Sequence, residues 1–159
     1  MPRVLSPTVF HPTLKFRFFV FSLQLPSAGM YARSAELPKA TNAPVTVDYR
    51  GHYFKMKGKT RWNDITISCY QFEGFTNREM WSYFKDHYNV SGGHDEDHTR
   101  YKHVLVLTQL NPMGAPIGSW RLDGAFFSDI DTGDMDWGAN DITECTLTIT
   151  YDFAEYIGV

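Results

Sequence analysis

A strict alternation of apolar residues and threonines runs from Cys145 to Tyr151. Apolar side chains occupy every odd position, and Thr146, Thr148 and Thr150 occupy the even ones. Successive side chains of a β-strand point to opposite faces of its sheet, so this pattern predicts a strand with one buried and one polar face. A chain with such a strand must contain a sheet that packs against a core on one side.

Similar patterns predict further strands along the chain. The predicted strands cover residues 14–25, 31–37, 45–49, 65–72, 101–110, 117–127 and 144–153. In the fourth of these, Ile65, Ile67 and Cys69 face one way, while Thr66 and Ser68 face the other. The strand 101–110 contains a continuous apolar run and is predicted to be buried on both sides. With no regular alternation of strands and helices, we expect antiparallel pairing.

One helix is predicted over residues 76–88. Thr76 and Glu79 have the spacing of a capping box, and Gly92-Gly93 lies beyond the helix end. The apolar stripe at helical spacing consists of Met80, Trp81, Phe84 and Tyr88, which we expect to pack on the sheet. The expected fold is therefore mainly β, a barrel or sandwich of about seven antiparallel strands with one flanking α-helix.

A length of 159 residues favours a single domain. Residues 1–13 contain three prolines and are expected to form an extended N-terminal arm, and residues 14–159 form the β-domain. No membrane anchor is expected, because no apolar stretch approaches the roughly 20 residues that span a bilayer. Cys69 and Cys145 occupy apolar strand positions and are expected to be buried, reduced thiols in a chain made in the cytoplasm.

Basic and aromatic residues are interleaved between Tyr49 and Trp62, with glycines at positions 51 and 58. This composition predicts a protruding hairpin or loop. It is open to three interpretations: a solvated loop, a protein contact loop or a nucleic-acid patch. The formal net charge of −3 argues against the last. The candidate contact residues are Arg50, His52, Tyr53, Phe54, Lys55, Lys57 and Lys59.

Patterns for catalysis or metal binding are weak. His94 and His98 flank three acidic residues, but the preceding glycines favour a surface loop. The acidic segment 129–136 fails as a calcium loop, because Ala139 stands where such a loop needs glutamate. Nucleophile-elbow, phosphate-loop and dinucleotide motifs are absent from the sequence. We therefore expect no catalytic, metal or cofactor site and no enzyme activity, with a small metal-dependent enzyme using His94 and His98 as a remote alternative.

Several short motifs follow one another in a characteristic order. Before the predicted helix, the strand residues 47–50 are followed by Lys57-Gly58-Lys59, then by Trp62-Asn63-Asp64, and then by the alternating residues 65–68. After the helix, the chain continues with a Gly124–Phe127 turn, then Met135-Asp136-Trp137, and ends with the alternating last strand. In this order, residues 14–156 resemble the contractile-phage (myovirus) tail tube protein family. Gly124, Phe126, Asp136 and Trp137 match the family's C-terminal motif and are expected to contribute to the core. One departure is Phe127-Ser128, where the family usually has a proline after the turn.

The resemblance implies hexameric rings that pool their strands into one β-barrel around a channel. Stacked helically inside a sheath, these rings would form the tube of a virion tail, assembled in the host cytoplasm and bound by baseplate and tail terminator proteins. Tape measure protein and genomic DNA would occupy the lumen, and the basic loop would contact the next ring. The fold is shared with type VI secretion and extracellular contractile injection tubes, so those tubes and a baseplate tube-initiator protein stay open as alternatives.

Two polar strand faces are candidates for the channel lining. They consist of Thr66 and Ser68, and of Thr146, Thr148 and Thr150, with Asp48, Asp64 and Asp152 as carboxylates that would repel phosphates. The apolar side chains between them are assigned to the core. A shift of one residue in register would invert every such assignment, so the opposite orientation also stays open.

Overall fold

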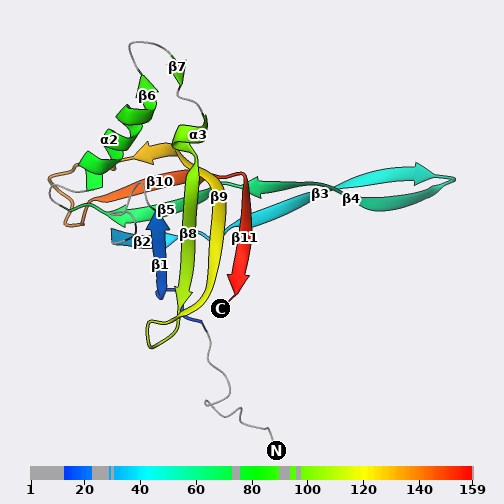
Figure 1. Ribbon diagram of the computed structural model, residues 1–159, viewed down its shortest axis with the longest axis horizontal. Helices are drawn as coiled ribbons and strands as arrows, with labels where there is room; N and C mark the ends of the chain where they lie inside the picture. Colours follow the sequence, from blue (N-terminus) through cyan, green and yellow to red (C-terminus); the bar gives the residue numbers. More distant parts are fainter. Residues whose placement is uncertain are drawn as a thin grey trace, which may run out of the picture.

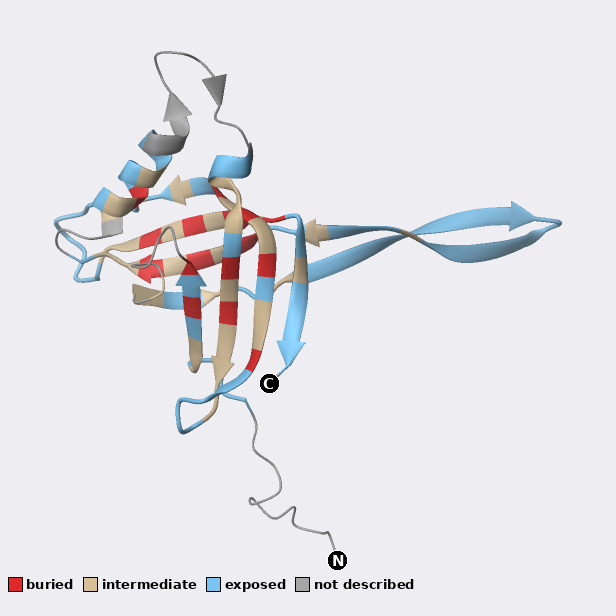
Figure 2. Ribbon diagram, viewed as in Figure 1, coloured by how far each residue is buried: buried red, intermediate tan, exposed pale blue. Residues whose placement is uncertain are grey.

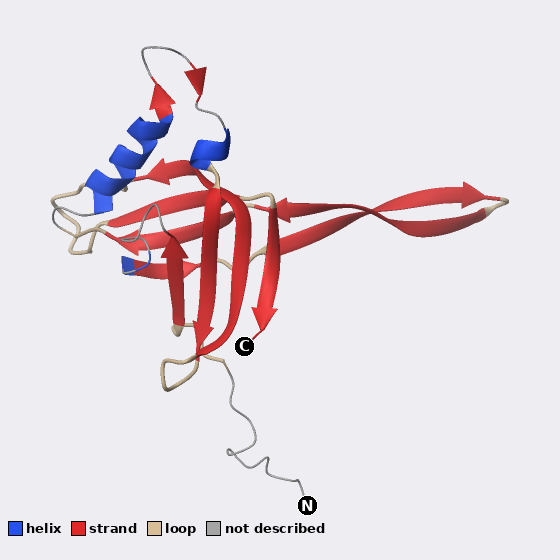
Figure 3. Cartoon of the chain, viewed as in Figure 1, coloured by secondary structure: helices blue, strands red, loops and turns tan. Residues whose placement is uncertain are grey.

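The computed structural model describes residues 13–22, 29, 31–72, 76–89, 94–95 and 98–158 (Figure 1). Within this part of the chain, a seven-stranded antiparallel sheet comprises β1 (Phe18–Ser22), β2 (Ala32–Ala35), β5 (Ile65–Tyr70), β8 (His103–Leu110), β9 (Pro116–Asp131), β10 (Glu144–Thr150) and β11 (Phe153–Gly158). Outside it lie the paired strands β3 (Lys39–Tyr49) and β4 (His52–Asn63), the short pair β6 (Tyr88–Asn89) and β7 (His94–Asp95), and the helices α2 (Thr76–His87) and α3 (His98–Tyr101). The predicted mainly β, antiparallel fold with a flanking helix is confirmed (Figure 3).

Strand β9 joins the two halves of the sheet. Its first part lies between β8 and β11, and its second part pairs with β10. In Figure 1, β1, β8, β9 and β11 run across the direction of β10, β5 and β2. The pairing with β8 shifts register opposite Gly124, which has a φ of 67°. Gly124 thus occupies a bulge that bends a continuous strand, whereas the sequence predicted a turn ending the strand there.

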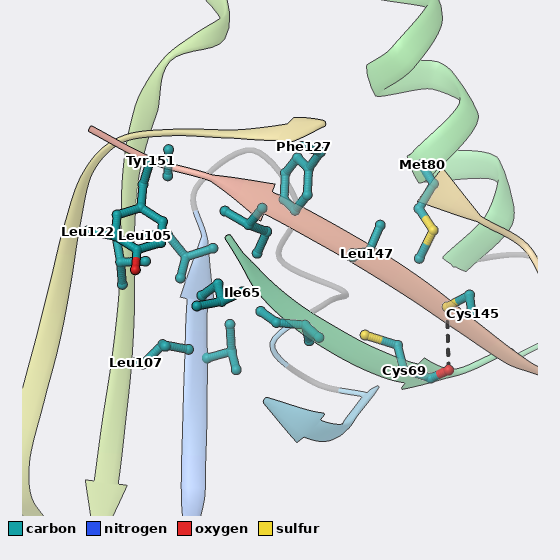
Figure 4. Close-up of a cluster of buried hydrophobic side chains, with 14 residues drawn as sticks. Ile65, Cys69, Met80, Leu105, Leu107, Leu122, Phe127, Cys145, Leu147 and Tyr151 are labelled. Atoms are coloured by element: carbon teal, nitrogen blue, oxygen red, sulfur yellow. Dashed lines mark hydrogen bonds between the residues drawn. The ribbon is translucent and has the colours of Figure 1, made fainter. Parts of the chain in front are cut away.

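The hydrophobic core lies between the two halves of the sheet, where buried side chains from β5, β8, β9 and β10 point toward one another (Figure 4). Cys145, Leu147, Ile149 and Tyr151 are all buried, which confirms the predicted apolar face of the last strand. The free thiol of Cys145 lies 3.4 Å from the carbonyl oxygen of its cross-strand partner Cys69. A hydrogen bond with the Cys145 side chain, together with burial, raises the pKa of Cys69, so this thiol is protonated at neutral pH.

Helix α2 contacts the core through Met80 and Tyr83. Met80 is buried, and the ring of Tyr83 meets that of Phe127 edge-on at 5.1 Å. Burial raises the pKa of Tyr83 to about 12. Trp81 and Phe84, predicted to lie in the buried stripe, are instead exposed, and their rings contact each other. That part of the prediction was wrong because the contact line passes through positions 80 and 83; the side chain of Tyr88 is outside the described residues.

Two strand boundaries and the burial of one strand differ from the prediction. Strand β9 continues through Asp129 and Asp131 into the predicted acidic loop. The predicted last strand is divided at Tyr151 and Asp152, beyond which the chain turns to pair β11 with β9. Strand β8 is buried on one side, since Val104 is exposed on the other.

The ends of the chain are only partly described. Of the predicted N-terminal arm, residues 1–12 lie outside the described residues, and β1 covers the middle of the predicted strand 14–25. Among the described helices, none has the length and apolar character that crossing a bilayer requires.

Replacing Gly124 by alanine should destabilise the bulge. A Cβ at this position would collide with the Asp152 carboxylate, and an L-residue at a φ of 67° is itself strained. We expect a loss of about 1–3 kcal/mol in the free energy of unfolding, measured in urea. Gly51 is the matched control, because its φ of 80° is similar but a Cβ there would meet no atom within 4 Å. An equal loss for both alanine variants would contradict a role for the collision.

Candidate assembly surfaces

A long hairpin projects from the sheet as a continuation of two of its strands (Figure 1). Strand β2 leads into β3 and β4 leads into β5, and the register runs from Lys39 opposite Asn63 to Tyr49 opposite His52. At the base, the rings of Trp62 and Tyr151 lie 6.0 Å apart. The structure therefore resolves the predicted hairpin or loop as a hairpin of residues 39–63.

The two faces of the hairpin differ in chemistry. The cross-strand pairs Val45–Met56 and Val47–Phe54 lie on one face and alternate with Thr46–Lys55 and Asp48–Tyr53 on the other. Four apolar side chains thus gather on one side of the ribbon, and each is exposed: Val45, Val47, Phe54 and Met56. We call these four residues the apolar hairpin face. Figure 2 shows that almost the whole projection is open to solvent, and exposed apolar patches of this kind mark interaction sites.

All seven candidate contact residues lie exposed on this hairpin: Arg50, His52, Tyr53, Phe54, Lys55, Lys57 and Lys59. Arg50 and Gly51 form the tip, both with positive φ angles. The sequence missed the contribution of β3, because Val45 and Val47 show their role only once they are paired with Phe54 and Met56.

A polar surface extends across β2, β5, β10 and β9. In one row, Thr148 stands between Thr66 and Asp129; in the next, Thr146 stands between Ser68 and Asp131. Ser34 extends the second row on β2. These hydroxyls and carboxylates alternate along their strands with the buried core residues (Figure 2). We call this set the polar sheet face.

The polar sheet face brings together only part of the candidate channel lining. Thr66, Ser68, Thr146 and Thr148 are adjacent, and Thr150 follows on β10 opposite Phe126. Its carboxylates are Asp129 and Asp131, at positions where the sequence predicts a loop. The signal that would have revealed them is the alternation Asp129-Ile130-Asp131, which continues the strand pattern.

The three predicted carboxylates lie elsewhere. Asp48 is on the hairpin, and Asp64 is exposed at its base, next to Tyr151. Burial, together with the nearby Asp64 charge, raises the pKa of Tyr151. Asp152 lies beyond β10, where both of its carboxylate oxygens accept hydrogen bonds from Lys102 Nζ at 2.8 and 2.9 Å. The lining role of Asp48, Asp64 and Asp152 stays a prediction, because it depends on how copies of the chain assemble.

The C-terminal motif residues also separate in space. Trp137 is fully exposed and Asp136 is exposed, so neither contributes to the core of the subunit. Asp136 Oδ1 instead accepts a hydrogen bond from the Gly138 backbone at 2.9 Å, which shapes a local turn. Phe126 is half-buried outside the core, with its ring 5.5 Å from that of Tyr101. Among the motif residues, Gly124 has the clearest structural role, because it forms the bulge.

Metal binding stays a remote prediction. The side chains of His94 and His98 lie outside the described residues. Among the residues that are described, no group of three or more His, Cys, Asp or Glu side chains is placed to hold a metal ion.

Comparison with known proteins reveals the fold. No protein-family model and no curated protein matches the sequence. Among solved structures, a chain of the sheath-tube complex of an extracellular contractile injection system, PVC, matches with a TM-score of 0.77 and 21% identity, over 98% of this chain and 99% of that one. A chain of the anti-feeding prophage (AFP) baseplate, determined with six-fold symmetrisation, matches with a TM-score of 0.70 and 14% identity, over 94% and 97%.

The fold is that of tube proteins of contractile injection systems. A third match is Hcp1 from Flavobacterium johnsoniae, with a TM-score of 0.51 and 12% identity over 91% of this chain and 97% of that one. The tube-protein fold therefore extends over nearly the whole chain, as the sequence resemblance of residues 14–156 predicted.

Proposed function

We propose that this chain is the structural subunit of a contractile tail tube and that it acts without catalysis. The observation that carries the proposal is the combination of a tube-protein fold with surfaces that remain open in the single subunit. These surfaces are the apolar hairpin face, the polar sheet face and an unpaired sheet edge. Each corresponds to one requirement of a tube: contact between rings, a wet channel and closure of the ring.

Ring closure follows from the sheet edges. In the described part of the chain, β11 pairs with β9 alone, and its other edge is exposed. Unpaired edges attract other strands, and pooling the strands of several subunits into one barrel removes them. Such a head-to-tail interface closes into a ring, and the six-fold symmetry of the matching baseplate particle supports a hexamer.

The polar sheet face is our candidate for the channel lining. Threonine and serine hydroxyls keep a surface wetted without binding cargo tightly, and Asp129 and Asp131 add negative charge that repels phosphates. This face has no Lys or Arg within its two rows. In the adjoining row, Glu144 is paired with Arg33.

Two kinds of particle use such a tube, and both are candidates for this chain. A myovirus tail would conduct DNA past a tape measure protein into a host, as the sequence resemblance implies. A bacterial contractile injection system is the second candidate, supported by the PVC match over almost the full length. In either particle the partners are a sheath outside the tube, with baseplate and terminator proteins at its ends; a baseplate tube-initiator role is a narrower variant, supported by the AFP baseplate match.

Negative-stain microscopy of the purified protein tests the proposal. We expect six-fold rings and hollow filaments that lengthen with protein concentration. A monomer that persists at all concentrations would refute a tube role. Isolated native particles then separate the two candidates, since DNA that resists added nuclease until the particle is disrupted indicates a virus, and the absence of enclosed DNA indicates an injection system.

Reversing the charge of the polar sheet face should slow cargo passage without preventing assembly. In the D129K/D131K variant, each lysine would attract a phosphate by about 1 kcal/mol at 4 Å in water, so we expect DNA delivery to fall about tenfold. Delivery is measured as infectivity or DNA uptake, alongside filament formation. The control is Met113→Lys, because Met113 lies exposed in the β8–β9 turn. Unchanged delivery by assembled D129K/D131K tubes would exclude this face from the lumen of a DNA-conducting tube.

A further inference from the structure

Charge is separated along the longest axis of the molecule. The hairpin, residues 39–63, contains six Lys or Arg residues and one Asp, whereas residues 131–144 contain five Asp or Glu and no Lys or Arg. Figure 1 shows the hairpin extending to one end of the molecule and the connection between β9 and β10 at the other end. A chain with a formal net charge of only −3 therefore has a basic end and an acidic end.

The acidic end surrounds a hollow of about 940 Å³. Asp134, Asp136 and Asp141 line it, and no described cation forms an ion pair with them; the one lysine or arginine in the lining, Arg33, is paired with Glu144. Met135, which is 92% exposed, and Ile142 contribute apolar surface to the same hollow. The connection is held in place at its base, where the backbone N–H of Gln71 donates to the Thr143 carbonyl at 3.0 Å. We call this region the acidic hollow.

We propose that the apolar hairpin face of one copy docks against the acidic hollow of a second copy. The inference rests on the proposed tube function and adds the surface that receives the hairpin. Val47, Phe54 and Met56 would cover Met135 and Ile142, removing exposed apolar area from water on both copies. Lysine side chains from the opposite hairpin face, such as Lys55 and Lys57, would reach past the ribbon edges toward the carboxylates.

Charge distinguishes this hollow from the other large one. A second hollow of about 510 Å³ is lined by apolar residues near β1 and β8, but also by Lys15 and Arg17. Arg33 borders both hollows, and its charge is paired with Glu144 at the acidic one. The hairpin cations would face Lys15 and Arg17 in the second hollow, and juxtaposed like charges oppose docking. The acidic hollow is therefore the surface that matches the hairpin in both charge and apolar character.

The position of the two surfaces determines how the contact propagates. Because they lie at opposite ends of the molecule (Figure 1), each copy both inserts a hairpin and receives one. Such a heterologous contact repeats without limit unless its rotation closes. It is therefore suited to stacking successive layers of a filament.

Crosslinking between two marked chains tests the placement. A Met56→Cys chain is mixed with a Met135→Cys chain of different mass and treated with a short thiol-specific bismaleimide; the native Cys69 and Cys145 are buried and are not expected to react. We expect a mixed crosslinked pair in assembled protein. The matched control replaces Met135→Cys by Met113→Cys, since Met113 is equally exposed, at 93%, but lies in the β8–β9 turn. Equal crosslinking to both positions, or none to position 135 in stacked filaments, overturns the inference.

Charge reversal tests whether attraction between the hairpin lysines and the aspartates of the acidic hollow contributes to stacking. K55E/K57E/K59E and D134K/D136K/D141K should each lower the fraction of protein in stacked filaments by about tenfold or more, and an equimolar mixture of the two variants should recover alternating contacts. Combining all six substitutions in one chain should restore stacking. If each variant fails and the combined chain fails too, although its rings form, the hairpin docks elsewhere.

If the unsubstituted protein forms neither rings nor stacks, the tube function itself is wrong, which is a different result from stacks that lack the 56–135 crosslink.

Discussion

Removing the hairpin should abolish filament formation while leaving a folded subunit. Asn42 and Thr60 are paired in register, so replacing residues 43–59 by Asn-Gly joins them through a two-residue turn. The deleted residues are almost all exposed and contribute little to the core. We expect unfolding free energy to change by less than about 1 kcal/mol, whereas stacking is lost because its apolar contact is gone. Sedimentation and negative-stain microscopy measure the assembly.

The position of the deletion matters. Removing only residues 51–59 would leave β3 without its partner strand and expose its backbone groups. A second variant, V45S/V47S/F54S, separates the apolar side chains from the hairpin backbone. It keeps the backbone but removes most of the apolar hairpin face, and it should also fail to stack. Filaments of normal length from the shortened chain would show that stacking does not use the hairpin.

Leu147→Ala should cause a large loss of subunit stability. Leu147 is completely buried in the middle of β10, between Ile67 on β5 and Ile130 on β9. Truncating a buried leucine removes apolar contacts and leaves a cavity, which costs about 2–5 kcal/mol. Urea denaturation followed by circular dichroism measures this loss, and assembly should fail at temperatures where the variant unfolds.

Two comparisons make that result specific. Leu147→Met nearly conserves volume and should lose less than about 1.5 kcal/mol. Val104→Ala removes an apolar side chain from the exposed side of β8 and should change stability by about 0.5 kcal/mol or less. If Leu147→Ala were as mild as Val104→Ala, the apolar face of β10 would not form the core.

Local patterns predicted the elements that repeat regularly. The alternation in β5 and β10 predicted both strands and correctly assigned Ile65, Ile67, Leu147 and Ile149 to the core. Burial of one strand face is dictated by side-chain chemistry at a period of two, so it can be read without knowing the partner strand. The basic, glycine-bounded segment likewise predicted a projection, because its residues cannot be buried together.

Which residues lie opposite one another in paired strands could not be predicted from the sequence. The apolar hairpin face requires Val47 opposite Phe54, and the carboxylates of the polar sheet face require Asp129 opposite Thr148. Trp81 and Trp137 show the converse error, since large apolar residues were assigned to the core although the fold leaves both on the surface. Which apolar residues are covered depends on how elements pack, and composition carries no information about that.

The sequence by itself determined the two-faced strands, their antiparallel arrangement and the separation of basic from acidic segments along the chain. Tertiary structure alone decided that the Gly124 bulge bends β9 into both halves of the sheet, and that the basic hairpin and the acidic hollow lie at opposite ends of the molecule. The physical reason is that a side chain's face depends on local backbone period, whereas its neighbours depend on register and on bends that a single residue in a rare conformation can introduce.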